Sequence, residues 1–174
     1  MEKVVIYSCT NRLGSNTLKV SMAYQKLLKV EGFFSEILDF KELPESLAFS
    51  ETFGRRSPQF EATIQSYVRP FQKIIFVIPE YNGSFPGILK TFLDSVHPSE
   101  WRDKKACLVG VSDGRAGNLR GMEHLTGVLQ YLKMHVFYDK LPISSVSKFL
   151  GEDFFFSTDQ EVACKRQIQG FIQF

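Results

Sequence analysis

A polar segment near the amino terminus has the composition of a phosphate-binding loop. It occupies residues 8–17, between an apolar run and a helical pattern, so it predicts a turn from a strand into a helix. The first N–H groups of a helix and the helix dipole favour an anion there, and an arginine adds charge and a bidentate fork. Ser15 or Asn16 could alternatively only cap the helix, but the number of donors favours binding. The candidate binding residues are Ser8, Thr10, Arg12, Ser15, Asn16 and Thr17.

The spacing within this loop excludes three better-known phosphate sites. Gly14 is its only glycine, so the Rossmann pattern GxGxxG and the P-loop pattern GxxxxGK[ST] are both absent. In a low-molecular-weight phosphatase, five residues separate the nucleophilic cysteine from an arginine. Here Ser15 occupies the position of that arginine relative to Cys9. The acidic residues of a receiver domain are also missing. We therefore predict that Cys9 is a small buried residue.

A second segment, residues 79–87, combines proline, glycine and polar residues. Its Asn–Gly pair permits positive φ, so the backbone can approach a flat ligand closely and direct N–H groups at ring heteroatoms. A tight turn followed by a helix cap explains the same residues equally well when the segment is taken alone. The candidate binding residues are Pro79, Glu80, Tyr81, Asn82, Gly83 and Ser84.

Alternating apolar segments indicate the elements that must position these loops. Short β-branched or aromatic runs predict strands, and apolar residues at helical spacing predict helices between them. We predict strands at residues 4–7, 35–40, 73–78, 106–111 and 136–138, and helices beginning near residues 15, 57, 84, 122 and 158. Because parallel strands need a crossover that is usually helical, this alternation predicts an α/β fold with a doubly wound sheet. Ligands of such sheets bind at the carboxyl ends of the strands, where the loops would lie.

The composition excludes several classes of protein. The chain of 174 residues fits a single domain over 1–174, and its 44% hydrophobic and 23% charged residues exclude a disordered protein. A formal net charge of +2 without a basic run gives no sign of a nucleic-acid partner. No segment reaches the ~18 apolar residues of a membrane span. The 17 phenylalanines are an unusual surplus, which we interpret as extra mass for the core; cover for an oligomer interface or for a flat ligand is the alternative.

The cysteines and histidines predict neither crosslinks nor a metal. Three cysteines without CxxC spacing fit no disulfide framework and no zinc site. His97, His124 and His135 lack metal-ligand spacing, so we expect no metal. No signal-peptide pattern opens the chain, and we expect a cytoplasmic protein.

The PEYNGS segment that ends at Ser84, with Pro-Gly and Leu-Lys following, resembles the signature of the NADPH-dependent FMN reductase family. The serine, threonine, asparagine and arginine residues of the first loop are similar to the phosphate loop of that family. The resemblance extends over residues 3–138. It implies a flavodoxin-like three-layer αβα sandwich, a five-stranded parallel sheet of strand order 2-1-3-4-5, and bound FMN.

A third segment, residues 112–118, lies where the family has a Ser-x-Gly-x-x-Gly-Gly loop beside the flavin. Asn118 replaces the second glycine of the final pair. We expect the turn to be kept, because asparagine tolerates the left-handed region better than most residues. The resemblance assigns Ser112, Asp113, Gly114 and Arg115 to cofactor binding. Arg115 could meet the flavin edge, a nicotinamide phosphate or a neighbouring subunit, or face solvent.

The resemblance further implies an oxidoreductase that passes electrons from NADPH or NADH through FMN to a quinone, azo compound, free flavin or similar small-molecule acceptor. FMN supplies such chemistry itself, so no side chain is predicted to be catalytic. A homodimer or homotetramer is also implied. The alternatives are a flavodoxin-type electron carrier and a non-catalytic flavin-binding regulatory protein. Flavodoxins are strongly acidic, so the near-neutral charge of this chain argues against the electron carrier. Their first loop also differs from this one, because it is rich in threonine.

Overall fold

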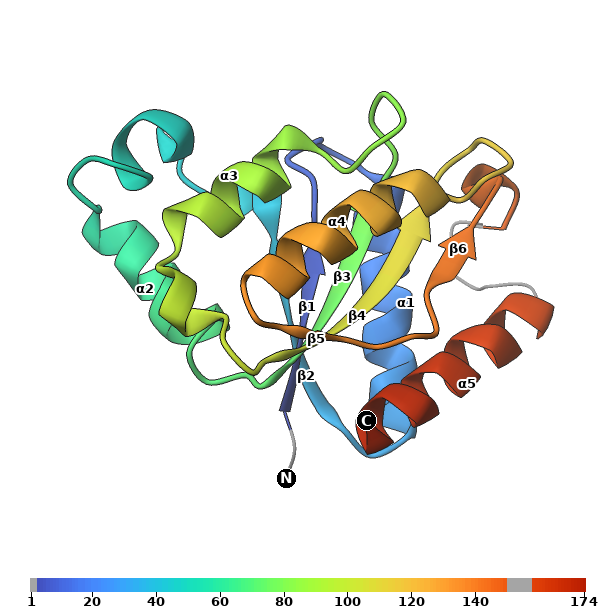
Figure 1. Ribbon diagram of the computed structural model, residues 1–174. Coiled ribbons are helices and arrows are strands. Elements are labelled where there is room, and N and C mark those ends of the chain that lie inside the picture. The colour runs from blue at the N-terminus through green and yellow to red at the C-terminus, as the bar shows by residue number, and fades with distance from the viewer. Residues whose placement is uncertain (1–2, 150–157) are drawn as a thin grey trace.

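The computed structural model describes residues 3–149 and 158–174, and within these residues six parallel strands form one sheet (Figure 1). Neighbouring strands follow the order β2-β1-β3-β4-β5, and β6 pairs with β4. The bounds are β1 (Lys3–Ser8), β2 (Phe34–Asp39), β3 (Lys73–Pro79), β4 (Lys105–Val111), β5 (His135–Val136) and β6 (Leu141–Ile143). This is the flavodoxin-like strand order, so the predicted α/β class and strand order are confirmed.

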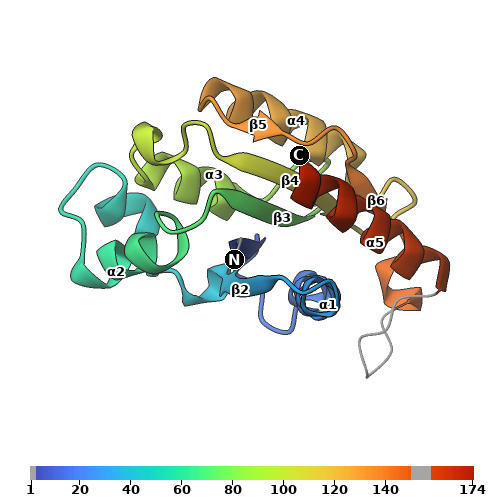
Figure 2. The same cartoon turned by 90° about the horizontal axis from the view of Figure 1, so that it is seen from below.

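Helices cover both faces of the sheet, which gives three layers (Figure 2). The helices α1 (Asn16–Val30) and α5 (Thr158–Gln173) pack on one face. The other face is covered by α2 (Pro58–Tyr67), α3 (Gly87–Ser95) and α4 (Leu119–Tyr131). Each face of the sheet has its own hydrophobic core, and successive residues of β1 alternate between them. Val4 and Ile6 lie in the core beneath α1 and α5, and Val5 and Tyr7 lie in the core beneath α2, α3 and α4.

Much of the phenylalanine surplus lies in the core on the α2–α4 face. The ring of Phe92 lies 4.8 Å from that of Phe40 and 5.8 Å from that of Trp101, and all three side chains are buried. Ring pairs at these separations add stabilisation beyond the area they bury. The prediction of a phenylalanine-rich core is therefore confirmed for this face, while Phe49 and Phe53 are exposed.

Two helices begin where their capping residues predict. The Ser15 hydroxyl accepts a hydrogen bond of 3.2 Å from the Leu18 N–H, and the Ser57 hydroxyl accepts one of 3.1 Å from the Phe60 N–H. Each bond satisfies an N–H group that has no partner inside the helix. Pro58 occupies the first turn of α2, where a missing N–H costs nothing. The first of these caps fixes the point at which the polar loop of residues 8–17 turns into α1.

The prediction for the fifth strand is wrong in detail. A strand was expected at residues 136–138, but β5 ends at Val136 and Tyr138 is exposed. The short β6 then returns to the same edge, so β5 pairs with the start of β4 and β6 with its end. The predicted five-stranded sheet therefore has a sixth strand, and β6 brings residues 141–147 to the carboxyl ends of the strands.

The irregular residues 41–56 fold against α3. The Thr52 hydroxyl lies 2.7 Å from the Ser95 hydroxyl, and the Arg56 guanidinium donates to the Ser95 carbonyl at 3.0 Å. Each of these bonds fastens the segment to the end of α3. Within residues 3–149 and 158–174, no helix is long and apolar enough to cross a membrane.

Candidate functional site

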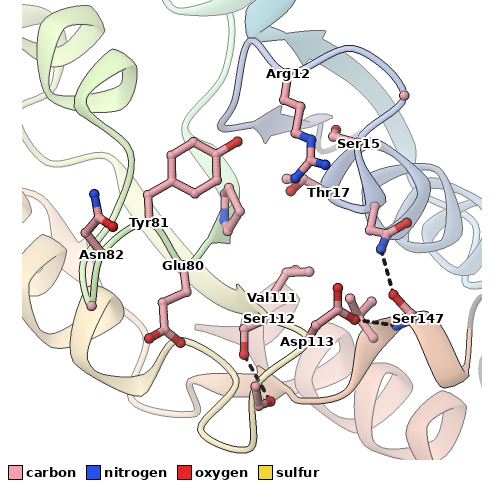
Figure 3. Close-up of a pocket in the computed structure, with 16 residues that line it drawn as sticks. Arg12, Ser15, Thr17, Glu80, Tyr81, Asn82, Val111, Ser112, Asp113 and Ser147 are labelled. Carbon is pink, nitrogen blue, oxygen red and sulfur yellow. Dashed lines mark hydrogen bonds between the residues drawn. The ribbon is translucent and has the colours of Figure 1, made fainter.

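A cleft of about 650 Å³ opens at the carboxyl ends of β1, β3 and β4 (Figure 3). Its size is typical of a pocket for a cofactor-sized ligand. It is lined by Arg12, Gly14, Ser15, Asn16, Thr17, Pro79, Glu80, Tyr81, Asn82, Gly83, Val111, Ser112, Asp113, Gly114, Val146 and Ser147. The three predicted loops therefore meet at one place, together with a fourth segment that follows β6.

The start of α1 forms the anion-binding side of the cleft. Thr17 is buried in the first turn, and Figure 3 shows the Arg12 guanidinium reaching toward it. Gly14 has φ +61°, a left-handed conformation that lets the chain turn sharply before the Ser15 cap. The first N–H groups of the helix, two hydroxyls and a guanidinium thus share one wall, which suits a phosphate group.

The second loop forms a tight turn on the opposite side. Tyr81 and Ser84 exchange two backbone hydrogen bonds, of 2.9 and 3.1 Å, across Asn82 and Gly83. Both central residues have positive φ, 50° and 76°, as a type I′ turn requires. The turn rests on α4, because a Cβ on Gly83 would lie only 3.2 Å from Nη1 of Arg120. The predicted Asn–Gly turn is confirmed.

A side-chain hydrogen bond joins the first two loops. The Tyr81 hydroxyl lies 2.7 Å from the Thr10 hydroxyl, and the Thr10 oxygen also accepts the Arg12 N–H at 3.2 Å. Thr10 is fully buried. Tyr81 thereby fixes the distance between the anion-binding wall and the tight turn.

Replacing Tyr81 by phenylalanine should lower the free energy of unfolding by about 1 kcal/mol, the usual worth of one partly buried hydrogen bond. The ring would stay in place, since only the hydroxyl is removed. Chemical denaturation of Y81F and the parent measures this difference. Tyr138→Phe is the matched control, because that side chain is exposed, and it should change stability by less than ~0.5 kcal/mol. Equal stabilities of Y81F and the parent would contradict a joining role for Tyr81.

The third loop is held by the segment that follows β6. Backbone hydrogen bonds join the Ser112 N–H to the Ile143 carbonyl at 3.0 Å and the Val146 N–H to the Ser112 carbonyl at 3.1 Å. Asp113 accepts the Ser147 N–H at 3.0 Å. Hydrogen bonding from the side chain and backbone of Ser147 lowers the pKa of Asp113, and the positive charge of Arg12 lowers it further. A carboxylate near the arginine is therefore ionised at neutral pH.

The cleft brings together most of the predicted binding residues, but four do not line it. Ser8 and Thr10 are buried below the cleft, and Arg115 is exposed beyond its rim. The Ser84 hydroxyl lies 2.9 Å from Nδ1 of His124 and so ties the turn to α4. Burial also raises the pKa of the Cys9 thiol, which confirms that Cys9 is a buried residue.

Sequence reasoning missed the fourth wall of the cleft, Val146 and Ser147. Ser147 accepts a hydrogen bond of 3.3 Å from the Asn16 side chain, so this segment contacts both the first and the third loop. The serine-rich run 144–147 was the only signal, and it gave no sign of its partners more than 30 residues away. Among residues 3–149 and 158–174, no three His, Cys, Asp or Glu side chains gather as a metal site would require.

Comparison with known proteins relates this cleft to a family. A family model described as NADPH-dependent FMN reductase matches residues 2–147. A 2-hydroxy-1,4-benzoquinone reductase from a Burkholderia species is 28% identical over 127 residues, which cover 66% of this chain and 69% of the relative. A probable NADPH:quinone oxidoreductase 2 from Oryza sativa subsp. japonica is 31% identical over 137 residues, which cover 76% of this chain and 66% of the relative. The matches thus span about two thirds of each relative's length.

The fold has a counterpart among solved structures. FerB, a flavoenzyme NAD(P)H:(acceptor) oxidoreductase from Paracoccus denitrificans, superposes with a TM-score of 0.80 at 18% identity, covering 99% of this chain and 96% of FerB. At this identity the likeness shows the fold alone. The family model, by contrast, runs from β1 through the third loop to Ser147 and so includes all four walls of the cleft. The chain therefore belongs to the NADPH-dependent FMN reductase family.

Proposed function

We propose that the protein is an FMN-dependent NAD(P)H oxidoreductase, formed by a single domain over residues 1–174. It takes electrons from NADPH or NADH and passes them through bound FMN to a quinone, azo compound, free flavin or similar acceptor. The observation that carries the proposal is the single cleft in which the start of α1 faces the left-handed turn at Asn82 and Gly83.

The donor set of the cleft fits the two ends of FMN. The phosphate suits the first N–H groups of α1, the hydroxyls of Ser15 and Thr17, and the Arg12 guanidinium. The flat ring suits the turn, where positive φ at Asn82 and Gly83 lets peptide groups approach it closely. We assign direct contacts to those predicted residues that line the cleft, and a supporting role to Thr10 and Ser84, whose hydroxyls hold the loops.

The chain's own tasks are binding and orientation. Bound FMN would supply the redox chemistry, accepting a hydride from the nicotinamide and donating electrons to the acceptor. Peptide N–H groups around Asn82 and Gly83 would stabilise negative charge on the ring. No side-chain acid or base is required for that role. A quinone acceptor is supported by the names of the Burkholderia and rice relatives.

We also propose a cytoplasmic homodimer or homotetramer. The three cysteines are buried free thiols, which suits a reducing compartment. An apolar groove of about 560 Å³ runs between α3 and α4, and its rim carries the exposed rings of Phe53 (94% exposed) and Tyr131 (87%). Large exposed aromatic side chains beside an apolar groove are typical of protein interfaces.

Anaerobic spectroscopy tests the proposed activity. Apoprotein titrated with FMN should bind it and turn yellow, NADPH or NADH should then bleach the flavin, and a quinone should restore the colour. Bound flavin that neither nicotinamide bleaches would contradict the reductase and favour an electron carrier. Failure to bind FMN at all would contradict both and favour a regulatory role.

A further inference from the structure

Asn118, which stands where the family pattern has a glycine, has a left-handed backbone conformation of the kind that glycine adopts readily. Its φ and ψ are 63° and 32°, and it directly follows Gly117, whose φ is 56°. Asparagine is among the few residues with a side chain that enter this left-handed region readily. The backbone of the third loop therefore does not require glycine at this position, and the side chain is an addition to the family pattern.

The added side chain ties the third loop to the base of the second loop. Asn118 is buried, and its Nδ2 donates a hydrogen bond of 3.0 Å to the carbonyl of Ile78. Ile78 immediately precedes Pro79, the first residue of the second loop to line the cleft. A glycine could not make this bond. Both bonded groups are buried, so the bond stabilises the contact between the third loop and β3.

Gly121 leaves room for the side-chain amide of Asn118. A Cβ at position 121 would lie 2.1 Å from Oδ1 of Asn118 and 2.8 Å from its Cγ, far inside contact distance. Gly121 lies within α4, where alanine would be the better helix former. At Gly121 the helix therefore leaves the room that the Asn118 amide occupies.

We propose that Asn118 is a positioning residue for the flavin cleft, because its amide fixes the third loop relative to the second. Ser112, Asp113 and Gly114 line one side of the cleft, and residues 79–83 line another. The Asn118 amide connects the last residue of the third loop to Ile78, the residue directly before the second loop. The inference rests on the proposed FMN-binding function and deepens it.

A double-mutant cycle on Asn118 and Gly121 tests this role. N118G restores the family glycine but removes the amide, and G121A displaces the amide from Ile78 by collision. Each should weaken FMN binding by about tenfold, the equivalent of one hydrogen bond. The double variant should bind FMN no worse than N118G, because the methyl group that G121A adds has room once the amide is gone. Fluorescence quenching of FMN by the apoproteins gives the dissociation constants.

Two further measurements separate positioning from general stability. At saturating FMN the visible spectrum of the flavin should differ between N118G and the parent, which a loss of stability alone would not produce. Lys133→Gly is the matched control: Lys133 also has φ 63° but lies exposed after the end of α4, so this variant should bind FMN as the parent does.

The outcomes discriminate between the two proposals. A parent that binds FMN, with N118G within about twofold of it or with additive effects in the cycle, would overturn the role of Asn118 and leave the proposed function intact. A parent that binds no FMN would overturn both.

Discussion

Replacing Ser15 by aspartate should weaken FMN binding by at least about a hundredfold and leave the fold as stable as in the parent. Aspartate caps helices as well as serine does, so it should keep the bond to the Leu18 N–H. A carboxylate also interacts favourably with the start of a helix. At ~4 Å from a phosphate charge, however, it would cost about 4 kcal/mol at an effective dielectric constant near 20.

Riboflavin, which lacks the phosphate, provides the control for the ligand. S15D should bind riboflavin within about threefold of the parent, because the repulsion acts on the phosphate alone. Ser15→Ala is the control for the cap: it should lose about 1 kcal/mol of stability without repelling an anion. Equal weakening of FMN and riboflavin binding by S15D would mean that the phosphate lies elsewhere in the cleft.

The parts of the fold that the sequence predicts correctly depend on local signals. The run from Ile74 to Ile78 is apolar throughout and becomes the buried centre of β3. Ser15 and Ser57 mark the first residues of α1 and α2, because a hydroxyl before a helix satisfies an N–H group only a few residues away. The Asn82–Gly83 turn likewise depends on the conformational freedom of those two residues. Such features require no knowledge of distant contacts.

The parts that escape prediction depend on distant partners. The strand β6 has three residues, includes a proline and shows no periodicity, so only its pairing with β4 makes it a strand. Ser147 enters the cleft because Asp113, 34 residues earlier, accepts its N–H. The direction of Ser84 is likewise set by His124, 40 residues later, which holds its hydroxyl against α4, outside the cleft lining.

Replacing Gly117 by alanine should lower the free energy of unfolding by about 3 kcal/mol, because the new methyl group has no room. Its Cβ would lie 2.6 Å from Cβ of Pro142 and 2.9 Å from the backbone nitrogen of Ile143, both in β6. The positive φ of 56° adds strain for any residue with a side chain. For a chain of this size the loss corresponds to a fall of about 10 °C in the melting temperature, measured by calorimetry.

Gly114→Ala is the matched control within the same loop. A Cβ there would meet only the Ser112 hydroxyl, at an ordinary 3.6 Å, so G114A should change stability by less than about 0.5 kcal/mol. Gly110→Ala should behave like G117A, since its Cβ would lie 2.1 Å from the Gly117 carbonyl oxygen on the other side of the contact. If G114A and G117A lost stability equally, flexibility of the loop would explain the effect. A selective loss in G110A and G117A would instead locate the requirement for glycine where the third loop packs between β4 and β6.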